Sequence, residues 1–157
     1  MDRWLVSVLQ RYPKLKGLLF DLSHVVGRAR ESLNAYGVAE RCSVIEGNFF
    51  ESLPGGADTY LFRHIIHDWN DEQSVQILNN CRKVIPKNGR LLIVEAVVPV
   101  GNEPSLAKDF DIVMLVLPGG IERTEEEYRL LFKQAGFRLS SITPTTSVVS
   151  VVEGRPM

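Results

Sequence analysis

Histidines and acids gather in the middle of the chain, where their spacing could support proton transfer. The segment His64-Ile65-Ile66-His67-Asp68-Trp69-Asn70 follows an apolar run and precedes a helical pattern. A histidine at the carboxyl end of a strand suits a general base, because its ordinary pKa of about 6.5 lies near neutrality. The alternative is that it only helps to begin the helix. Because residues three apart on a strand point to opposite faces, we do not expect His64 and His67 to share a metal ion.

Two later acids could orient such a base. Glu95 interrupts the apolar run 91–98, where a buried carboxylate is costly unless a cation or a hydrogen-bond donor pairs with it. A histidine at the end of the neighbouring strand would serve, and the carboxylate would then fix its tautomer. Alternatively, Glu95 turns to solvent. Glu122, beside Arg123, is either a second orienting acid or half of a surface ion pair of little energetic value.

A ligand-binding acid is predicted closer to the N-terminus. Asp21 ends the apolar run 17–22, where a carboxylate can accept hydrogen bonds from both hydroxyls of a ribose. The alternative is an acid that favours the N-terminus of the next helix. No G-x-G-x-x-G loop precedes Asp21, so we do not expect NAD. Cys42 and Cys81 have no CxxC spacing and no G-x-S-x-G motif is present, so nothing indicates nucleophilic catalysis.

Apolar runs alternate with helical patterns along the chain, and these elements must position the polar residues. Strands are predicted over 17–22, 42–46, 59–66 and 90–98. Helices are predicted near 4–12, 25–36, from Asn70 to about 85, after 103 to near Pro118-Gly119-Gly120, and from the capping box Thr124-Glu125-Glu126-Glu127 to Gly136. Two last strands, 137–143 and 147–152, have a short connection and should pair antiparallel. This order predicts an α/β fold with a doubly wound sheet.

Composition limits the class of protein. At 157 residues, with 45% apolar and 24% charged residues, the chain fits one domain over 1–157. The net charge of −1 gives no reason to expect binding to nucleic acid or to a membrane surface. The first eight residues do not fit a secretory signal, and no apolar run approaches the roughly 20 residues of a membrane helix. We therefore expect a cytoplasmic protein that binds a small molecule.

Five blocks of the sequence, taken together, carry a resemblance to a known family. They are 19–22 (LFDL), 47–50 (GNFF), 67–72 (HDWNDE), Glu95 and 119–124 (GGIERT). In their order and separation they resemble the S-adenosylmethionine-dependent O-methyltransferases of the plant caffeic acid and animal hydroxyindole type, with their bacterial relatives. The resemblance runs through nearly the whole chain but covers only the later part of that family's catalytic domain.

The resemblance implies an activity and its catalytic residues. S-adenosylmethionine would be the cofactor, and the acceptor would be a phenolic or other hydroxyl-bearing small molecule. His67 would deprotonate the acceptor hydroxyl, with Glu95 and Glu122 on either side of it. The sulfonium methyl group is already activated, so alignment and removal of one proton suffice and no metal is required.

The resemblance also implies a cofactor site. Asp21 would bind the ribose, the segment Gly47-Asn48-Phe49 would contact the adenine, and Arg63 would lie beside the cofactor. The family usually has Asp at position 48. The amide of Asn48 can still accept a hydrogen bond but carries no charge, so we expect weaker cofactor binding.

The fold implied is a Rossmann-like methyltransferase sheet that lacks the family's first strand and glycine-rich loop. That strand is normally central, so its loss would leave two inner strand edges unpaired. The strands could close up, exchange between chains, or be completed by a separately encoded segment. Exchange between chains would make the protein a homo-oligomer. The competing hypothesis is a non-catalytic module that oligomerises or binds a ligand. A third is a nucleotide-binding domain of another class.

Overall fold

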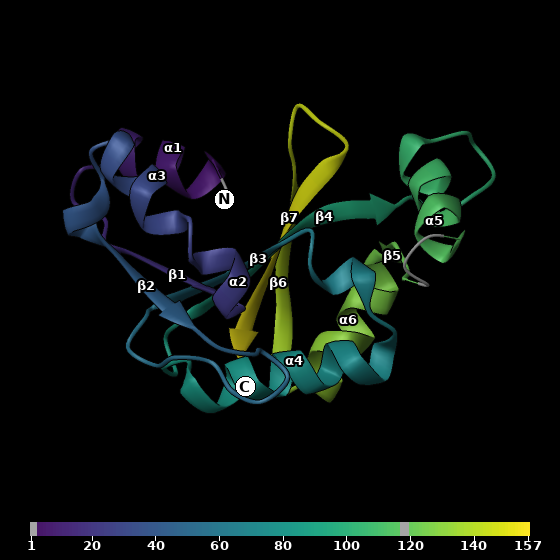
Figure 1. Cartoon of the computed structure of the whole chain (residues 1–157). Helices are drawn as coiled ribbons and strands as arrows, with labels where there is room; N and C mark the ends of the chain where they lie inside the picture. The colour runs from purple at the N-terminus through teal and green to yellow at the C-terminus, as the bar shows by residue number, and fades with distance from the viewer. Residues whose placement is uncertain (1–2, 117–119) are drawn as a thin grey trace. The chain divides into compact units, whose positions relative to one another are not determined.

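The computed structural model describes residues 3–116 and 120–157 (Figure 1). Within the chain, Met1–Pro54 and Gly55–Met157 form two compact units, and each is described by itself. This division does not decide the prediction of a single domain.

A small parallel sheet forms the centre of the first unit. Its helices and strands are α1 (Arg3–Arg11), β1 (Gly17–Asp21), α2 (Ser23–Val26), α3 (Ala29–Ala35), a 3₁₀ turn η1 (Ala39–Arg41) and β2 (Cys42–Glu46). β1 and β2 pair in parallel, with Asp21 opposite Glu46 at their carboxyl ends. The buried core of this unit consists of Val6, Leu9, Leu33, Val38 and Cys42. Both strands lie where the sequence predicted them.

The helix predicted over 25–36 is divided in two. α2 ends at Val26, and α3 begins at Ala29 after Gly27 and Arg28. Glycine lowers helix stability by about 1 kcal/mol relative to alanine, which favours an interruption at this point. The prediction of one continuous helix was therefore wrong, although Gly37 follows α3 with the positive φ expected of a terminating glycine.

The second unit contains a mixed sheet. Its helices and strands are β3 (Thr59–Arg63), a 3₁₀ turn η2 (Ile66–Asp68), α4 (Asp71–Val84), β4 (Arg90–Val98), α5 (Leu106–Val116), β5 (Arg123–Thr124), α6 (Glu125–Gln134), β6 (Phe137–Pro144) and β7 (Val149–Pro156). The strand order is β3-β4-β7-β6, and β5 pairs with the end of β4. β3 is parallel to β4, whereas β7 is antiparallel to both β4 and β6. The predicted antiparallel C-terminal hairpin is confirmed.

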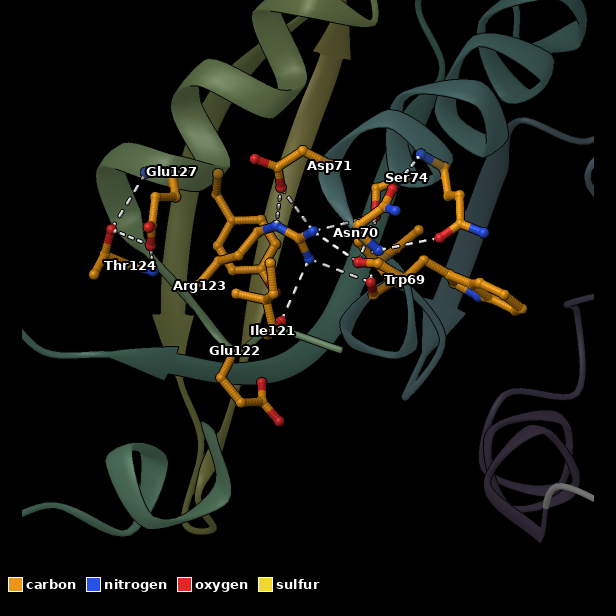
Figure 2. A network of polar contacts seen from close by, with 12 residues as sticks. Trp69, Asn70, Asp71, Ser74, Ile121, Glu122, Arg123, Thr124 and Glu127 are labelled. Carbon is orange, nitrogen blue, oxygen red and sulfur yellow. Dashed lines mark hydrogen bonds and ion pairs between the residues drawn. The ribbon is translucent and has the colours of Figure 1, made fainter. Parts of the chain in front are cut away.

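Helix starts in this unit follow the predicted capping chemistry. Asn70 caps α4 by accepting a hydrogen bond from the backbone N–H of Gln73, whose side chain accepts one from Asn70 in return. Thr124 and Glu127 form the same reciprocal pair at the start of α6 (Figure 2). α4 and α6 pack against each other beside the central strand β4, whose Leu91, Ile93 and Ala96 are fully buried. These elements form the main core of the unit.

The apolar helix α5 ends, as far as the structure describes it, at Val116. Its predicted end near Pro118-Gly119-Gly120 falls partly on residues 117–119, which lie outside the described residues. Leu106, Ile112 and Leu115 are exposed on this helix. Within residues 3–116 and 120–157, no helix has both the length and the apolarity that crossing a membrane requires.

Strands at the edges of the sheets have one hydrogen-bonded neighbour each. Among the described residues these strands are β1, β2, β3, β5 and β6. The expectation that a missing central strand leaves one edge of β1 and one edge of β3 unpaired stays a prediction. A strand edge exposes backbone N–H and C=O groups that can pair with another strand.

Hydrogen exchange should separate the two units. A two-stranded sheet over a small core opens more easily than the sheet around β4, because fewer apolar contacts are lost on opening. We expect amides of β1 and β2 to exchange at least about tenfold faster than those of β4 and β7, which corresponds to about 1.4 kcal/mol of opening free energy. Mass spectrometry of deuterium uptake measures this, and equal protection in both sheets would contradict it.

Candidate active site

A tight turn follows β3 and presents the two histidines. The strand predicted through Ile66 ends at Arg63, because His64 adopts a φ of 52°, in the left-handed region that bends the chain away from the sheet. The His64 and His67 rings then lie with their centroids 5.3 Å apart. The prediction that they point to opposite faces was therefore wrong. Even so, in the part of the chain that the structure describes, no group of three or more His, Cys, Asp or Glu side chains could hold a metal ion.

His67 is hydrogen-bonded to an acid from a distant part of the chain. Its Nδ1 lies 2.7 Å from Oε1 of Glu122, whose side chain is only 3% exposed. Because a carboxylate only accepts, Nδ1–H of His67 is the donor, and Nε2 then carries a lone pair. Oδ1 of Asp68 is 3.6 Å from Nε2, beyond hydrogen-bond distance. Nε2 is thus the atom that can take a proton, and the alternative of a surface ion pair for Glu122 was wrong.

The surroundings make His67 more basic than His64. Burial by itself lowers the pKa of His67, but the hydrogen bond to Glu122 and the charges of Glu95, Glu122 and Asp68 outweigh it and raise the pKa. The pKa of His64 is lowered, first by burial and then by the charges of Arg63 and His67. Of the two imidazoles that lie side by side, His67 is therefore the one suited to proton transfer.

Glu95 is fully buried and binds the backbone of the turn. Its Oε1 accepts hydrogen bonds from the N–H groups of Ile65 and Ile66, at 3.0 and 2.7 Å. Its Oε2 accepts one from the hydroxyl of Tyr128, at 2.9 Å. Burial, together with the charge of Glu95, raises the pKa of Tyr128 well above its ordinary value, so this hydroxyl keeps its proton. A donor partner was rightly expected, but it is neither a histidine nor solvent.

Arg123 binds the same turn from its other end (Figure 2). Its guanidinium is 1% exposed and donates to the carbonyl oxygens of Ile66, at 3.2 Å, and Trp69, at 2.9 Å. It also donates to the carboxylate of Asp71 and to the hydroxyl of Ser74. The sequence analysis missed this role, because the partners Ile66 and Ser74 are 57 and 49 residues away.

A close backbone contact joins the turn after β3 to the segment before α6. The N–H of Ile121 donates to the carbonyl of His67, at 2.8 Å. A Cβ on Gly120 would collide with that same carbonyl oxygen, so only glycine fits at this position. Glu122 follows two residues later, within reach of the His67 ring. Gly119, the other glycine of the predicted motif, lies outside the described residues.

A pocket of about 420 Å³ borders the histidines. Its polar lining includes Arg63, His64, His67 and Glu122. The other lining residues come from β4, α5, the β6–β7 connection and the start of β7, and they are Ala96, Phe110, Met114, Ser147, Val148 and Val149. A mostly apolar pocket with a few polar groups beside a basic histidine is the usual form of a small-molecule site.

The predicted ribose-binding acid stands at the end of β1 in the first unit. Oδ1 of Asp21 accepts a hydrogen bond from the N–H of Leu22, at 2.7 Å. This contact fixes the carboxylate at the carboxyl end of a parallel strand, where α/β proteins bind ligands. The position of Asp21 and the acceptor oxygens of its carboxylate fit a ribose, which offers two hydroxyl donors.

The predicted adenine segment follows β2 in the same unit. Oδ1 of Asn48 accepts from the N–H of Phe50, at 3.0 Å, and its Nδ2 donates to Glu51, at 3.2 Å. A Cβ on Gly47 would lie 2.5 Å from the ring of Phe20, so Gly47 has a packing reason to be glycine. The rings of Phe49 and Phe50 lie 5.0 Å apart. The side-chain oxygen and nitrogen of Asn48 thus make hydrogen bonds within the turn. The predicted contact with adenine would use the same atoms.

Comparison with known proteins identifies the family. A sequence profile described as the O-methyltransferase domain matches residues 4–138. The chain belongs to this O-methyltransferase family. The phenazine O-methyltransferase PhzM of Lysobacter antibioticus is 44% identical over 153 residues, which cover 98% of this chain and 45% of that protein. The chain therefore spans less than half the length of this relative.

Solved structures of the family have the same fold. LaPhzM is 43% identical, with a TM-score of 0.95 over 99% of this chain and 47% of its own. CalO1, a methyltransferase of calicheamicin biosynthesis solved with SAH bound, is 44% identical, with a TM-score of 0.91 over 98% of this chain and 45% of its own. The Rossmann-like methyltransferase fold expected from the sequence is thereby confirmed.

Replacing Arg123 should loosen the turn that presents His67. In Arg123→Lys, one ammonium cannot reach the carbonyls and the carboxylate that the guanidinium joins, so buried carbonyls lose one of their donors. We expect the free energy of unfolding to fall by about 1–3 kcal/mol. Urea titration measures it. The control Arg129→Lys alters a half-exposed arginine that forms exposed ion pairs with Glu125 and Glu126 and should change stability by less than about 1 kcal/mol. Equal losses in both variants would contradict this role for Arg123.

The titration of His67 should depend on Glu122. In Glu122→Gln the pKa of His67 should fall, because a neutral amide no longer stabilises the imidazolium. The pKa of His67 is raised by folding, so its contribution to stability is complete below the unfolded value of about 6.5 and is lost as the pH rises through the folded value. NMR titration of the imidazole protons measures the pKa. An unchanged pKa in the variant would show that Glu122 does not act on His67.

Proposed function

We propose that this chain supports the transfer of a methyl group from S-adenosylmethionine to the hydroxyl of a small aromatic molecule, with His67 as the general base. The observation that carries the proposal is the hydrogen bond from Nδ1–H of His67 to Glu122, which leaves Nε2 able to accept a proton beside an apolar pocket. Membership of the O-methyltransferase family supports the reaction type.

His67, Glu122 and Glu95 have different roles in the proposed proton removal. Nε2 of His67 accepts the hydroxyl proton, and Glu122 stabilises the imidazolium that results. Glu95 acts through the backbone: it binds the N–H groups at the start of η2 and so sets the position of the His67 ring. S-adenosylmethionine, when bound, supplies an activated methyl group, so the protein needs no nucleophile of its own.

The cofactor-binding residues implied by the resemblance belong to this proposal. Asp21 would accept hydrogen bonds from the ribose, and Gly47, Asn48 and Phe49 would contact the adenine. Arg63, which lines the pocket beside His67, would lie near the cofactor. Because Asn48 is neutral and already bonds to Phe50 and Glu51, we expect this part of the site to bind more weakly than an aspartate would.

The acceptor follows from the chemistry of the pocket. Phe110, Met114 and Val148 offer apolar surface suited to an aromatic ring, and His67 requires a hydroxyl that it can deprotonate. PhzM is named as a phenazine O-methyltransferase, and we extend to this chain only the class, a small aromatic hydroxyl.

The two cysteines offer no competing chemistry. Both are buried thiols, and burial raises the pKa of Cys81 to about 12. A protonated, buried thiol is a poor nucleophile. Free thiols also suit a reducing compartment, which supports our proposal of a cytoplasmic protein.

One observation favours a second candidate function, a non-catalytic module that oligomerises or binds a ligand. Among the described residues, β1 and β3 each have a single hydrogen-bonded neighbour. Such edges can pair with another chain. This candidate requires neither cofactor binding nor a basic His67, so it is separable by experiment.

Cofactor binding and transfer test the proposal. Calorimetric titration of the 157-residue chain should show binding of S-adenosylmethionine and S-adenosylhomocysteine. With tritium-labelled cofactor and catechol as acceptor, His67→Gln should lower the rate of methyl transfer by about 10²–10⁴-fold, because a general base is lost. Cofactor binding should persist in this variant.

The control is His24→Gln, which alters an exposed histidine and should transfer at the wild-type rate. Absence of heat with either form of the cofactor would favour the non-catalytic module. Preference for NAD or ATP would favour a nucleotide-binding domain of another class. Equal rates for His67→Gln and the wild type would remove His67 as the base.

A further inference from the structure

Three consecutive N–H groups hold the segment before α6 in place. The N–H of Gly120 donates to the carbonyl of Met114 near the end of α5, at 3.0 Å, and the N–H of Ile121 donates to the carbonyl of His67, at 2.8 Å. The N–H of Glu122 donates to Oδ1 of Asp111, also on α5, at 2.9 Å. The segment is therefore joined to α5 at two points and to the turn after β3 at one.

The bond to Asp111 is the one that a side chain accepts. Asp111 is a half-buried acid within the mostly apolar helix α5. A carboxylate in such surroundings is costly unless a donor pairs with it. A hydrogen bond from an N–H to a carboxylate is roughly twice as strong as one between neutral groups. The contact therefore both satisfies Asp111 and holds the backbone of Glu122 firmly.

This backbone determines where the Glu122 carboxylate points. The neighbouring cation Arg123 donates to Asp71 and to the turn after β3, and the Glu122 side chain extends away from it (Figure 2). The main-chain contact at Gly120 sets how far the turn and the segment lie apart. The N–H that Asp111 accepts belongs to Glu122 itself, so this bond sets the direction in which the carboxylate projects.

Loss of the bond would disturb the contact with His67. Glu122 is 5% exposed, and a buried N–H without an acceptor is costly, so its peptide group would rotate toward another acceptor. The carboxylate lies several bonds from that peptide group. A small rotation there displaces it from the 2.7 Å contact with Nδ1 of His67.

We propose that Asp111 is a positioning residue for the proposed reaction, and that it orients the Glu122 carboxylate toward Nδ1 of His67 by accepting the N–H of Glu122. This inference rests on the proposed function, because it takes His67 as the base and Glu122 as the acid that orients it. The helix α5 then has two roles. It borders the pocket with Phe110 and Met114, and through Asp111 it holds the acid that orients the base.

The proposed role depends on an acceptor oxygen rather than on a charge. The acids whose charges raise the pKa of His67 are Glu95, Glu122 and Asp68. Asp111→Asn keeps a side-chain oxygen that can accept the N–H of Glu122, whereas Asp111→Ala has none. Both variants lose the same charge, so a difference between them reports the hydrogen bond alone.

NMR titration of the His67 imidazole in the 157-residue chain tests the inference. In Asp111→Asn the pKa of His67 should stay at the wild-type value. In Asp111→Ala it should fall, because the hydrogen bond and the charge of Glu122 move away from Nδ1. The control Asp109→Ala removes an exposed carboxylate two residues earlier on α5 and should leave the pKa unchanged. Should Asp111→Ala fail to fold, Asp111→Ser replaces it, because its hydroxyl is one bond shorter than the carboxylate.

Methyl transfer supplies a second readout. With saturating S-adenosylmethionine and catechol, Asp111→Ala should lower kcat by about tenfold or more, because the base is no longer held in its productive orientation. Asp111→Asn should restore kcat to within about twofold of the wild type. Calorimetry should give the same affinity for S-adenosylhomocysteine in both variants, since Asp111 is not among the predicted cofactor residues.

Three results would overturn the inference: a wild-type pKa of His67 in Asp111→Ala, an equal fall in Asp111→Asn and Asp111→Ala, or a wild-type kcat in Asp111→Ala. The proposed function fails on different measurements, the binding of S-adenosylmethionine and the effect of His67→Gln on transfer. A pKa of His67 that depends on Asp111, in a chain that transfers no methyl group, would support the orienting role of Asp111 and reject methyl transfer.

Discussion

The hydrogen bond between His67 and Glu122 is the contact on which the site depends. It joins residues 55 positions apart in the sequence, fixes the tautomer of the imidazole, and contributes to the raised pKa of His67. None of these properties belongs to either residue alone. The bond forms because the turn after β3 and the segment before α6 meet at a backbone contact, with the carbonyl of His67 against Gly120 and Ile121.

Two buried ions of opposite charge support that turn from its two ends. Glu95 accepts the N–H groups of Ile65 and Ile66, which no helix could satisfy at its first turn. Arg123 donates to the carbonyls of Ile66 and Trp69, which also accept from the hydroxyl of Ser74. Burying either ion is costly by itself, and each is stabilised by several hydrogen bonds to the backbone it fixes. These hydrogen bonds hold the five-residue turn 65–69 in place.

The sequence predicted those features that depend on neighbouring residues. The capping boxes at Asn70 and Thr124, the strand over 42–46 and the antiparallel hairpin all follow from local spacing, and the structure confirms them. The turn at His64 could not be predicted in this way, because a positive φ at a non-glycine residue runs against local preference and is imposed by tertiary contacts. The partners of Glu95 and the role of Arg123 could not be predicted from the sequence for a related reason. They depend on which distant carbonyl and amide groups the fold brings close to these side chains. The roles of Asp21, Gly47, Asn48, Phe49 and Arg63 toward a cofactor stay predictions.

The contact at Gly120 has an evolutionary consequence. Because main chain meets main chain there, the spacing between the base and its acid does not depend on the size of any side chain. Phe110, Met114 and Val148 border the pocket from other segments, and none of them makes that contact. Mutations among these three residues can therefore reshape the cavity while the proton-transfer pair stays in place, so that new acceptor preferences are open to selection without loss of the chemistry.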